Sequence, residues 1–481
     1  MKLYSNKNRF KIWSLFLLML SGVLLMEGCK DISSKSNLPN IIIFLADDMG
    51  YGDLGCYGSS DINSPNIDKI ASEGVRFTNF YSNGPECTPT RVALMTGRYQ
   101  QRAGGLECAV GAGNVGRYDE AEWLAGQGEL GLPVSENTLL QALKRKGYQT
   151  AKFGKWHLGY EKKFRPIKHG FDHSFGPIGY GGDYFYHTEQ VETGMDDLTG
   201  MHTLMENNQE VFYTGRYYTR LFTQKAVEWL KSRKTGKPFF LYMPYTAPHS
   251  PYQGPDDMID RPLTADEWNI GTRETYVKMT ESLDSGIGNI LDYLSENKLE
   301  EETLVIFFSD NGGTKKADNG PFSGNKGQVF EGGIHVPCII KWPGKIEEKI
   351  VSNQTCLSFD LTASVLRIIG VEHDDVKLDG IDIISHVENN TADFERTLFW
   401  RKKRGNGVFK AIRHGEWKYL IQEDNLKVIH EGLFNLKDDP SENQNLLNVN
   451  PVLVEELKTK INEWEDEVKA DRLIPFINSK K

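Results

Sequence analysis

Short apolar runs recur along the chain, and longer stretches with helically spaced apolar residues lie between them. Apolar runs rich in β-branched and aromatic residues predict strands, whereas the amphipathic stretches predict helices. The predicted strands are 40–46, 148–154, 238–243, 303–309 and 336–342, and the predicted helices are 136–146, 219–233, 275–297 and 360–369. Strands that are apolar throughout are typical of a parallel sheet with helices on both faces. The sequence therefore predicts an α/β protein with a large, mostly parallel central sheet between helices.

The pattern changes after residue 388. Shorter predicted strands at 397–400, 408–420 and 432–436 precede one helix at 452–470. This order predicts a small antiparallel sheet with a C-terminal helix. Because a chain of 481 residues exceeds the usual size of a single core, we expect an N-terminal domain at 39–388 and a C-terminal subdomain at 389–481.

The N-terminus predicts export. Four cationic residues at positions 2–11 precede an apolar run at 12–26, which is short for a membrane span and typical of a secretory signal. We expect a signal peptide at 1–29 and a polar tether at 30–38, with the protein in the periplasm or at the cell surface. Gly28-Cys29 resembles a bacterial lipoprotein cleavage site, which would anchor the chain to the membrane through a lipid on Cys29. Secretion without a lipid is the alternative.

Composition excludes some partners. A net charge of −10 argues against non-specific nucleic-acid binding, so we expect no nucleic-acid partner, and an anionic substrate would need local cations. The cysteines show neither a disulfide framework nor the spacing of a zinc site, and their pairing stays open. They are Cys29, Cys56, Cys87, Cys108, Cys338 and Cys356.

Polar side chains that can bind ions follow the ends of the predicted strands. They are Asp47 and Asp48, Lys155 and His157, His249, and Asp310 and Asn311. Ligands in open α/β sheets bind at the carboxyl ends of the strands, so we expect these side chains to lie together. The carboxylate and amide oxygens suit Ca²⁺, and Mg²⁺ less well, rather than zinc. A solvated turn is the alternative interpretation of Asp47 and Asp48.

A helix is predicted to start near Cys87. Pro89 suits the first turn of a helix, which places Cys87 just before its N-terminus and Arg91 one turn further on. Free backbone N–H groups and the helix dipole favour a phosphate or sulfate there, and Arg91 adds bidentate recognition. A buried structural cysteine before an ordinary helix is the alternative interpretation.

The string Cys-x-Pro-Thr-Arg-x-x-Leu-Met-Thr-Gly-Arg at 87–98 resembles the signature of the type I sulfatases, whose Cys or Ser is oxidised after synthesis to formylglycine (3-oxoalanine). Gly-Lys-Trp-His-Leu-Gly at 154–159 matches the second signature of that family. The resemblance implies an alkaline-phosphatase-like fold and a formylglycine-generating maturation enzyme as a partner. It also implies the catalytic residues Cys87, Arg91, Lys155, His157, His249 and Lys326, and the metal ligands Asp47, Asp48, Cys87, Asp310 and Asn311.

The resemblance implies a mechanism as well. One hydroxyl of the hydrated formylglycine attacks sulfur and expels the alcohol, and the other then collapses to the aldehyde and releases sulfate. The metal, Arg91 and the two lysines would stabilise the developing charge. His249, with Lys326, is the expected acid for the leaving oxygen, and His157 is the expected base for the second hydroxyl. Asp310 is expected to accept the attacking proton as well as bind the metal.

An exported enzyme of this kind meets polymers, so we expect a sulfated carbohydrate as substrate. Segments 113–120 and 128–133 resemble bacterial sulfatases linked to host or algal glycans. The first expectation is exo-acting hydrolysis of sulfated galactose or N-acetylgalactosamine, with uronate and glucosamine sulfates and the ester position left open. Two other functions also stay open: phosphate or phosphonate monoester hydrolysis within the same superfamily, and capture of sulfated glycans by a lipoprotein whose Cys87 is never oxidised.

Two long connections, 104–131 and 160–218, are predicted to be loops that choose the sugar. The second is rich in aromatic residues that can stack on sugar faces, and Asp183 or His187 is expected to face the substrate, with ordinary loop packing as the alternative. His335 stands where many sulfatases have Arg, so the function of that position stays open.

Overall fold

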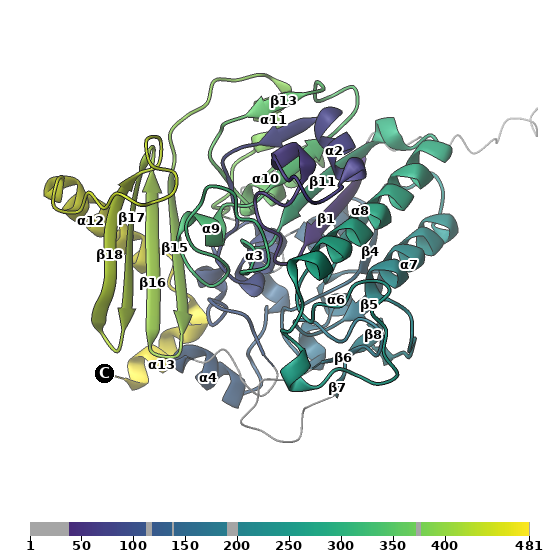
Figure 1. Cartoon of the computed structure of the whole chain (residues 1–481), viewed down its shortest axis with the longest axis horizontal. Helices are drawn as coiled ribbons and strands as arrows, with labels where there is room; N and C mark the ends of the chain where they lie inside the picture. Colours follow the sequence, from purple (N-terminus) through teal and green to yellow (C-terminus); the bar gives the residue numbers. More distant parts are fainter. Residues whose placement is uncertain (1–37, 112–117, 137–138, 190–200, 372–376, 481) are drawn as a thin grey trace, which may run out of the picture. The chain divides into compact units, whose positions relative to one another are not determined.

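A ten-stranded mixed sheet forms the centre of the structure (Figure 1). Its strands lie in the order β13-β2-β12-β11-β1-β10-β4-β5-β8-β9. They are β1 (Asn40–Ala46), β2 (Val75–Phe77), β4 (Gln149–Phe153), β5 (His173–Pro177), β8 (Leu204–Glu206), β9 (Gln209–Glu210), β10 (Phe239–Pro244), β11 (Thr303–Ser309), β12 (Cys338–Lys341) and β13 (Ile350–Ser352). The computed structural model describes residues 38–480 apart from 112–117, 137–138, 190–200 and 372–376. The predicted signal peptide, Cys29 and residues 30–37 of the predicted tether lie outside the described residues.

The neighbouring strands β11, β1, β10, β4 and β5 run parallel. Within this group Ile43 of β1 lies opposite Tyr242 on one side and Ile306 on the other. Every residue of β1 is buried, which explains why the strand is apolar on both faces. The predicted central sheet is therefore confirmed, and the antiparallel strands β12, β2, β8 and β9 extend it.

Helices cover both faces of this sheet. Ile41, Ile43 and Leu45 of β1 belong to the core beneath α3 (Cys87–Thr96), α5 (Leu139–Arg145), α10 (Phe359–Ile368) and α11 (Ile383–Glu388). Ile42 and Phe44 belong to the core beneath α2 (Pro65–Ser72), α7 (Tyr218–Ser232) and α8 (Arg273–Glu296), and α7 and α8 run side by side in Figure 1. Because side chains alternate across a strand, one strand contributes to both hydrophobic layers.

A four-stranded antiparallel sheet follows, formed by β15 (Thr397–Arg404), β16 (Gly407–His414), β17 (Trp417–Asp424) and β18 (Lys427–Asn435). Its core includes residues of α12 (Pro451–Glu467), as predicted for a small sheet with a C-terminal helix. Trp400 packs with Tyr81 and Ala93 of the N-terminal part. Segment 408–420 is a hairpin rather than one strand, because Gly415 adopts a φ of 58° that reverses the chain.

The proposed boundary at residue 388 falls between α11 and β15. The described residues of 38–233 and 238–480 belong to one compact unit, so the two sheets pack within the same body.

The two segments predicted to be loops contain regular structure, so that part of the prediction is wrong, and their role in choosing the sugar stays a prediction. Segment 104–131 includes α4 (Asp119–Gly126), whose first turn is rich in the acidic residues that helix N-termini favour. Segment 160–218 contains α6 (Pro166–His169) and strands β5, β8 and β9 of the large sheet, together with the pair β6 (Thr188–Glu189) and β7 (Met201–His202). This segment joins the sheet because β5 pairs with β4, and no local sequence pattern predicts that pairing.

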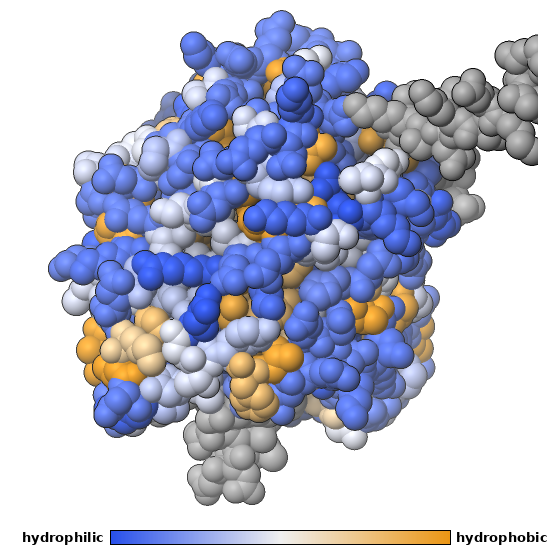
Figure 2. Space-filling view, turned by 90° about the vertical axis from the view of Figure 1, so that its right-hand side faces the viewer, coloured by the Kyte–Doolittle hydropathy of each residue, from blue (hydrophilic) through white to orange (hydrophobic). Residues whose placement is uncertain are grey.

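The short elements are β3 (Phe80–Tyr81), β14 (Cys356–Leu357), α9 (Glu331–Ile334), α13 (Ile474–Ser479) and 3₁₀ turns at Gly55–Tyr57, Gln100–Ala103, Val134–Glu136, Lys162–Phe164, Ala265–Glu267, Glu300–Glu302 and Asp471–Leu473. No helix in the described part of the chain is long and apolar enough to cross a membrane. The face drawn in Figure 2 is hydrophilic over most of its area, with small separate hydrophobic patches of the kind that ordinary protein surfaces carry.

Candidate active site

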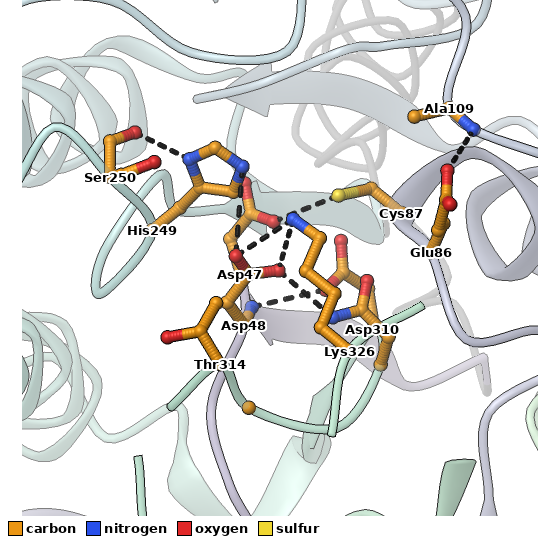
Figure 3. A network of polar contacts seen from close by, with 12 residues as sticks. Asp47, Asp48, Glu86, Cys87, Ala109, His249, Ser250, Asp310, Thr314 and Lys326 are labelled. Atoms are coloured by element: carbon orange, nitrogen blue, oxygen red, sulfur yellow. Dashed lines mark hydrogen bonds and ion pairs between the residues drawn. The ribbon is translucent and has the colours of Figure 1, made fainter. Parts of the chain in front are cut away.

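The ends of four parallel strands and the start of one helix converge on a single site (Figure 3). The chain leaves β1 into Asp47 and Asp48, β11 into Asp310 and Asn311, β4 into Lys155 and His157, and β10 into the loop that carries His249, while Cys87 begins α3. Asp48 has a left-handed φ of 65°, so the backbone turns directly after the strand. Ligand atoms of Asp47, Asp48, Cys87 and His249 all lie within 4.8 Å of one another. The structure thus brings the strand-end residues together.

Cys87 lies between the carboxylate of Asp47 and the side-chain nitrogen of Lys155. Its Sγ atom is 3.3 Å from Oδ1 of Asp47 and 3.4 Å from Nζ of Lys155, and Nζ of Lys155 is 2.6 Å from Oδ2 of Asp47. All three side chains are buried. Burial raises the pKa of the Cys87 thiol, and the Asp47 carboxylate raises it further. The thiol therefore stays protonated and donates to Asp47, which makes unmodified Cys87 a weak nucleophile.

Arg91 lies one turn into α3 and joins this helix to the end of β11. Its Nε and Nη2 atoms are 3.0 Å and 2.8 Å from Oδ2 of Asp310, and its Nη1 donates to the Lys155 carbonyl at 3.2 Å. Burial and the nearby Asp47 carboxylate raise the pKa of Asp310 to about 6, although the Arg91 guanidinium opposes the shift. In this structure Arg91 therefore holds a carboxylate, the kind of anion that its planar fork matches.

Asp48 is surrounded by donors and cations. Its carboxylate accepts from Nζ of Lys326 at 2.7 Å and from Nδ2 of Asn311 at 2.9 Å, and Nε2 of His249 lies 3.6 Å from its Oδ2. Burial would raise the pKa of Asp48, but the charges of Lys326 and Lys155 hold it well below its usual range. Asp48 is therefore ionised, and its partner Lys326 has a raised pKa because the attraction of Asp48 outweighs burial.

The residues present fit a hard divalent cation. Oδ1 of Asn311 is buried and has no hydrogen-bond partner among the described residues, while the carboxylates of Asp47 and Asp48 lie close by. Oδ1 of Asp310 accepts only a long hydrogen bond, at 3.3 Å, from the Asp48 N–H in the described part of the chain. Oxygen donors of this kind suit Ca²⁺ or Mg²⁺. His249 also belongs to the cluster of possible ligands, where the sequence had suggested only an acid.

His157 is neutral and presents a lone pair. Its Nε2 donates to the Val110 carbonyl at 2.9 Å, and its buried Nδ1 has no hydrogen-bond partner within the described residues. Burial lowers the pKa of His157 well below its ordinary value, and the cations Lys155 and Arg91 lower it further. The ring can therefore accept a proton at Nδ1, as the predicted base would.

His249 points its two ring nitrogens at different groups. Nδ1 contacts the Ser250 carbonyl, so it carries the ring proton, and Nε2 with its lone pair faces Asp48. Burial and the Lys326 charge lower the pKa of His249 to about 3, so its imidazole is neutral at neutral pH in the absence of substrate.

Three residues considered from the sequence lie away from this chemistry. His335 is buried, bonds to Glu331 through Nδ1 at 3.0 Å and to the Thr78 carbonyl through Nε2 at 2.7 Å, and stacks on Phe322. Both of its ring nitrogens are therefore occupied by structural contacts.

The prediction that Asp183 or His187 faces the sugar is wrong. Both are fully buried. Oδ1 of Asp183 accepts from the N–H groups of Phe185 and Tyr186, both at 2.9 Å, and Nε2 of His187 bonds to a backbone carbonyl. The Asp183 contacts are short-range and turn the chain locally, as Asp commonly does, whereas the His187 contact reaches the carbonyl of Arg216.

Tyr180 is a residue that sequence reasoning missed. Its ring centroid lies 6.2 Å from that of His157, 6.1 Å from that of His249 and 6.4 Å from that of Trp268. Its side chain is partly exposed, unlike those of Asp183 and His187. The available signal was its place in the aromatic-rich segment 160–218, which does not distinguish Tyr180 from the other aromatic residues there.

Two family models match the sequence. The model described as Sulfatase matches residues 39–371, which is more than half of the chain. The chain belongs to the sulfatase family. The model described as N-sulphoglucosamine sulphohydrolase, C-terminal, matches residues 322–467 of this sulfatase.

Similar proteins agree with this assignment. N-acetylgalactosamine-6-sulfatase of Canis lupus familiaris is 34% identical over 405 residues, which cover 79% of this sulfatase and 71% of that protein. Arylsulfatase A of Bos taurus is 31% identical over 486 residues, which cover 91% and 87% of the two chains. The family and these relatives make this sulfatase a sulfuric ester hydrolase, as predicted, and favour sulfate over phosphate or phosphonate esters and cleavage over capture.

Solved structures support the fold. Ps i-CgsB matches the sulfatase with a TM-score of 0.76 and 30% identity over 89% of this chain and 93% of that chain, and it has also been solved in complex with k-i-k-neocarrahexaose. Phosphonate monoester hydrolase of Agrobacterium radiobacter, at 18% identity, covers 89% of this chain and 96% of its own with a TM-score of 0.62, and shares the fold alone. The predicted alkaline-phosphatase-like fold is confirmed.

Proposed function

We propose that this sulfatase removes sulfate from a carbohydrate through a formylglycine formed from Cys87 by a maturation enzyme. The observation that carries the proposal is the position of Cys87. It begins α3, whose N–H groups receive no side-chain cap from the N-cap residue Glu86, and its Sγ lies within 3.4 Å of both Asp47 and Lys155. A protonated, buried thiol in such a place is poorly suited to attack a sulfate ester itself. Conversion of its side chain explains why the site is built around it.

When present, the hydrated formylglycine supplies a hydroxyl oxygen for attack on sulfur, and a divalent cation held by Asp47, Asp48, Asp310 and Asn311 supplies positive charge beside it. The rest of the work falls to the chain's own side chains. Lys155 and Lys326 would exchange their carboxylate contacts for sulfate oxygens and stabilise the charge that develops on them. Arg91 holds Asp310, the expected acceptor of the attacking proton.

The two histidines would move the remaining protons. A sulfate anion beside Lys326 would offset the positive charge that lowers the pKa of His249, and so favour a proton on Nε2 for the leaving oxygen. His157 would take a proton at Nδ1 when sulfate is released. Both rings lie near that of Tyr180, which is the residue we propose to contact the sugar.

The proposed substrate is a terminal sulfated galactose or N-acetylgalactosamine, attacked in exo fashion. Support comes from the names of the relatives, which include N-acetylgalactosamine-6-sulfatases, and from the neocarrahexaose complex of Ps i-CgsB. The first ester position to test is therefore the 6-sulfate. We also propose that the protein acts after export and is anchored through a lipid on Cys29.

The proposal is tested on residue 87. Mass analysis of the peptide spanning this residue should show the aldehyde, and Cys87→Ala should abolish release of sulfate from N-acetylgalactosamine 6-sulfate. Cys56→Ala, which alters a partly exposed cysteine, serves as the matched control and should keep full activity. Turnover by Cys87→Ala within tenfold of the parent, or an unmodified thiol in fully active protein, would refute the proposal.

A further inference from the structure

The end of β15 carries four consecutive cations, Arg401, Lys402, Lys403 and Arg404. Because side chains alternate along a strand, Lys402 and Arg404 share a face with Trp400, and Arg401 and Lys403 share the other. Each cation contacts a carboxylate from the N-terminal part: Arg401 binds Glu107, Lys402 and Arg404 bind Glu86, and Lys403 binds Glu120. The C-terminal sheet is therefore tied by charge to the segment that starts at Glu86.

Lys402 contacts two segments of the active site, one next to Cys87 and one next to Lys326. Its buried Nζ lies 2.7 Å from Oε1 of Glu86, the residue before Cys87, and 2.8 Å from the carbonyl of Gly327, the residue after Lys326. The same two segments also meet directly, since the Gly327 N–H donates to the Pro85 carbonyl at 2.7 Å. One ammonium group thus fixes the residues next to the nucleophile position and next to Lys326.

Glu86 needs these cations. It is buried, and its carboxylate accepts from the Ala109 N–H at 2.8 Å and from Nη1 of Arg404 at 3.0 Å in addition to Lys402 (Figure 3 shows the Ala109 contact). Burial would raise the pKa of Glu86, but Lys402 and Arg404 lower it to about 2, so Glu86 stays ionised. A buried carboxylate that loses one of its cations will move toward other donors or water.

We propose that Lys402 is a positioning residue for catalysis, which holds the start of α3 and the segment of Lys326 at the separation that the reaction requires. The proposal rests on the proposed function, in which residue 87 and Lys326 act on the same sulfate. Reacting groups tolerate little displacement, and a shift of about 1 Å can cost on the order of a hundredfold in rate. The C-terminal sheet would then contribute to activity without touching substrate.

The test compares Lys402→Met with Lys403→Met. Both changes remove one ammonium group from the same strand, but Lys403 pairs with Glu120 on the opposite face and is partly exposed. With formylglycine content equalised by mass analysis, we expect Lys402→Met to lower kcat/KM on N-acetylgalactosamine 6-sulfate about tenfold or more and Lys403→Met to stay within about twofold. Lys402→Arg should recover most of the loss, since its guanidinium can bind both the carboxylate and the carbonyl.

Amide hydrogen exchange provides a readout that does not depend on turnover. Lys402→Met should speed exchange selectively in 82–90 and 324–330, whereas Lys403→Met should leave those segments unchanged. If Lys402→Met fails to fold, Glu86→Gln takes its place, because it keeps an acceptor for Ala109 but removes the charge that Lys402 binds. Parent-like activity and exchange in Lys402→Met or its substitute, or equal losses in Lys403→Met, would overturn the proposal. A parent without turnover would refute the proposed function but leave the exchange comparison decisive for Lys402.

Discussion

The side-chain Nδ2 of Asn311 donates to Oδ1 of Asp48 at 2.9 Å, and this hydrogen bond joins the carboxyl ends of β11 and β1. The other amide atom of Asn311, Oδ1, is buried and has no partner in the described part of the chain. An unsatisfied buried carbonyl oxygen costs about 1–3 kcal/mol, and a cation at this position would remove that cost. The pair therefore marks the place where a metal should bind.

We expect Ca²⁺ to stabilise the folded protein and Asn311→Ala to weaken the effect. A cation that binds only the native state adds about 2.7 kcal/mol at a hundredfold excess over its Kd, so chelator-treated protein should gain thermal stability when Ca²⁺ is added. Calorimetric Tm values with and without Ca²⁺ measure the gain. Asn289→Ala, on the exposed face of α8, should gain as much as the parent. Active protein without a stoichiometric divalent metal by elemental analysis would contradict the prediction.

Replacing His249 should matter most when the leaving group is a strong base. A sugar alkoxide needs a proton as it departs, whereas a nitrophenolate leaves without one, and general acids contribute roughly 10²–10⁴-fold. We therefore expect His249→Ala to lose far more kcat on N-acetylgalactosamine 6-sulfate than on nitrophenyl sulfate. Steady-state kinetics on both substrates provide the comparison, and equal losses would assign His249 to the metal or to folding instead.

Tyr180→Ala should impair recognition of the sugar rather than the chemistry. An aromatic ring beside both histidines can cover the apolar face of the sugar, so kcat/KM on the sulfated sugar should fall about tenfold more than on nitrophenyl sulfate. Tyr186→Ala is the matched control, because Tyr186 belongs to the same segment and donates its hydroxyl to the carbonyl of Ile259. If both variants lose sugar activity equally, the effect comes from the segment and not from Tyr180.

The pH dependence of stability should include a contribution from Glu442. Lys418 lies 2.8 Å from Glu331 and 2.9 Å from Glu442, so two buried carboxylates share one ammonium group. Burial raises the pKa of Glu442 from 4.5 to about 7. The charge of Lys418 opposes this shift, and the charge of Glu331 adds to it. The native state then holds a proton that the unfolded state releases, and this stabilisation is complete below about pH 4.5 and lost as the pH rises through about 7.

Glu442→Gln should therefore remove part of the decline in Tm between pH 5 and pH 8. One group can lower the free energy of unfolding by at most about 1.4 kcal/mol per pH unit. Thermal unfolding of the parent and the variant across this range measures the difference. Glu456→Gln, at an exposed position of α12, should follow the parent curve. Parallel curves for Glu442→Gln and the parent would show that Glu442 does not titrate in this range.

The sequence was most informative where a buried strand ends in polar residues. The apolar run of β1 followed by Asp47 and Asp48, and that of β11 followed by Asp310 and Asn311, placed these side chains at one sheet edge, because parallel strands share their direction. Predicting this convergence needs only the direction of the strands and not the pairing register between them. The converging residues of the site were therefore accessible to a pattern argument.

Contacts between distant segments were not accessible in the same way. Nothing local to Arg404 indicates a partner 318 residues away at Glu86, since a run of cations on a strand is compatible with a solvated edge. Likewise Asp183 is a residue type that commonly binds sugar hydroxyls and lies in an aromatic-rich segment. Its carboxylate instead accepts hydrogen bonds from neighbouring backbone N–H groups. Which side chain faces outward depends on tertiary packing that one sequence does not display.

The charged contacts of β15 also limit how this sulfatase can be recombined with its relatives. Replacing the C-terminal sheet of this sulfatase by that of another family member would remove Arg401–Arg404 while leaving Glu86, Glu107 and Glu120 in place. A chimaera would therefore have to carry both halves of each pair, or it would bury carboxylates without their cations. For the design of such chimaeras the small sheet and the segment that begins at Glu86 therefore form one unit of exchange, although 318 residues separate Glu86 from Arg404.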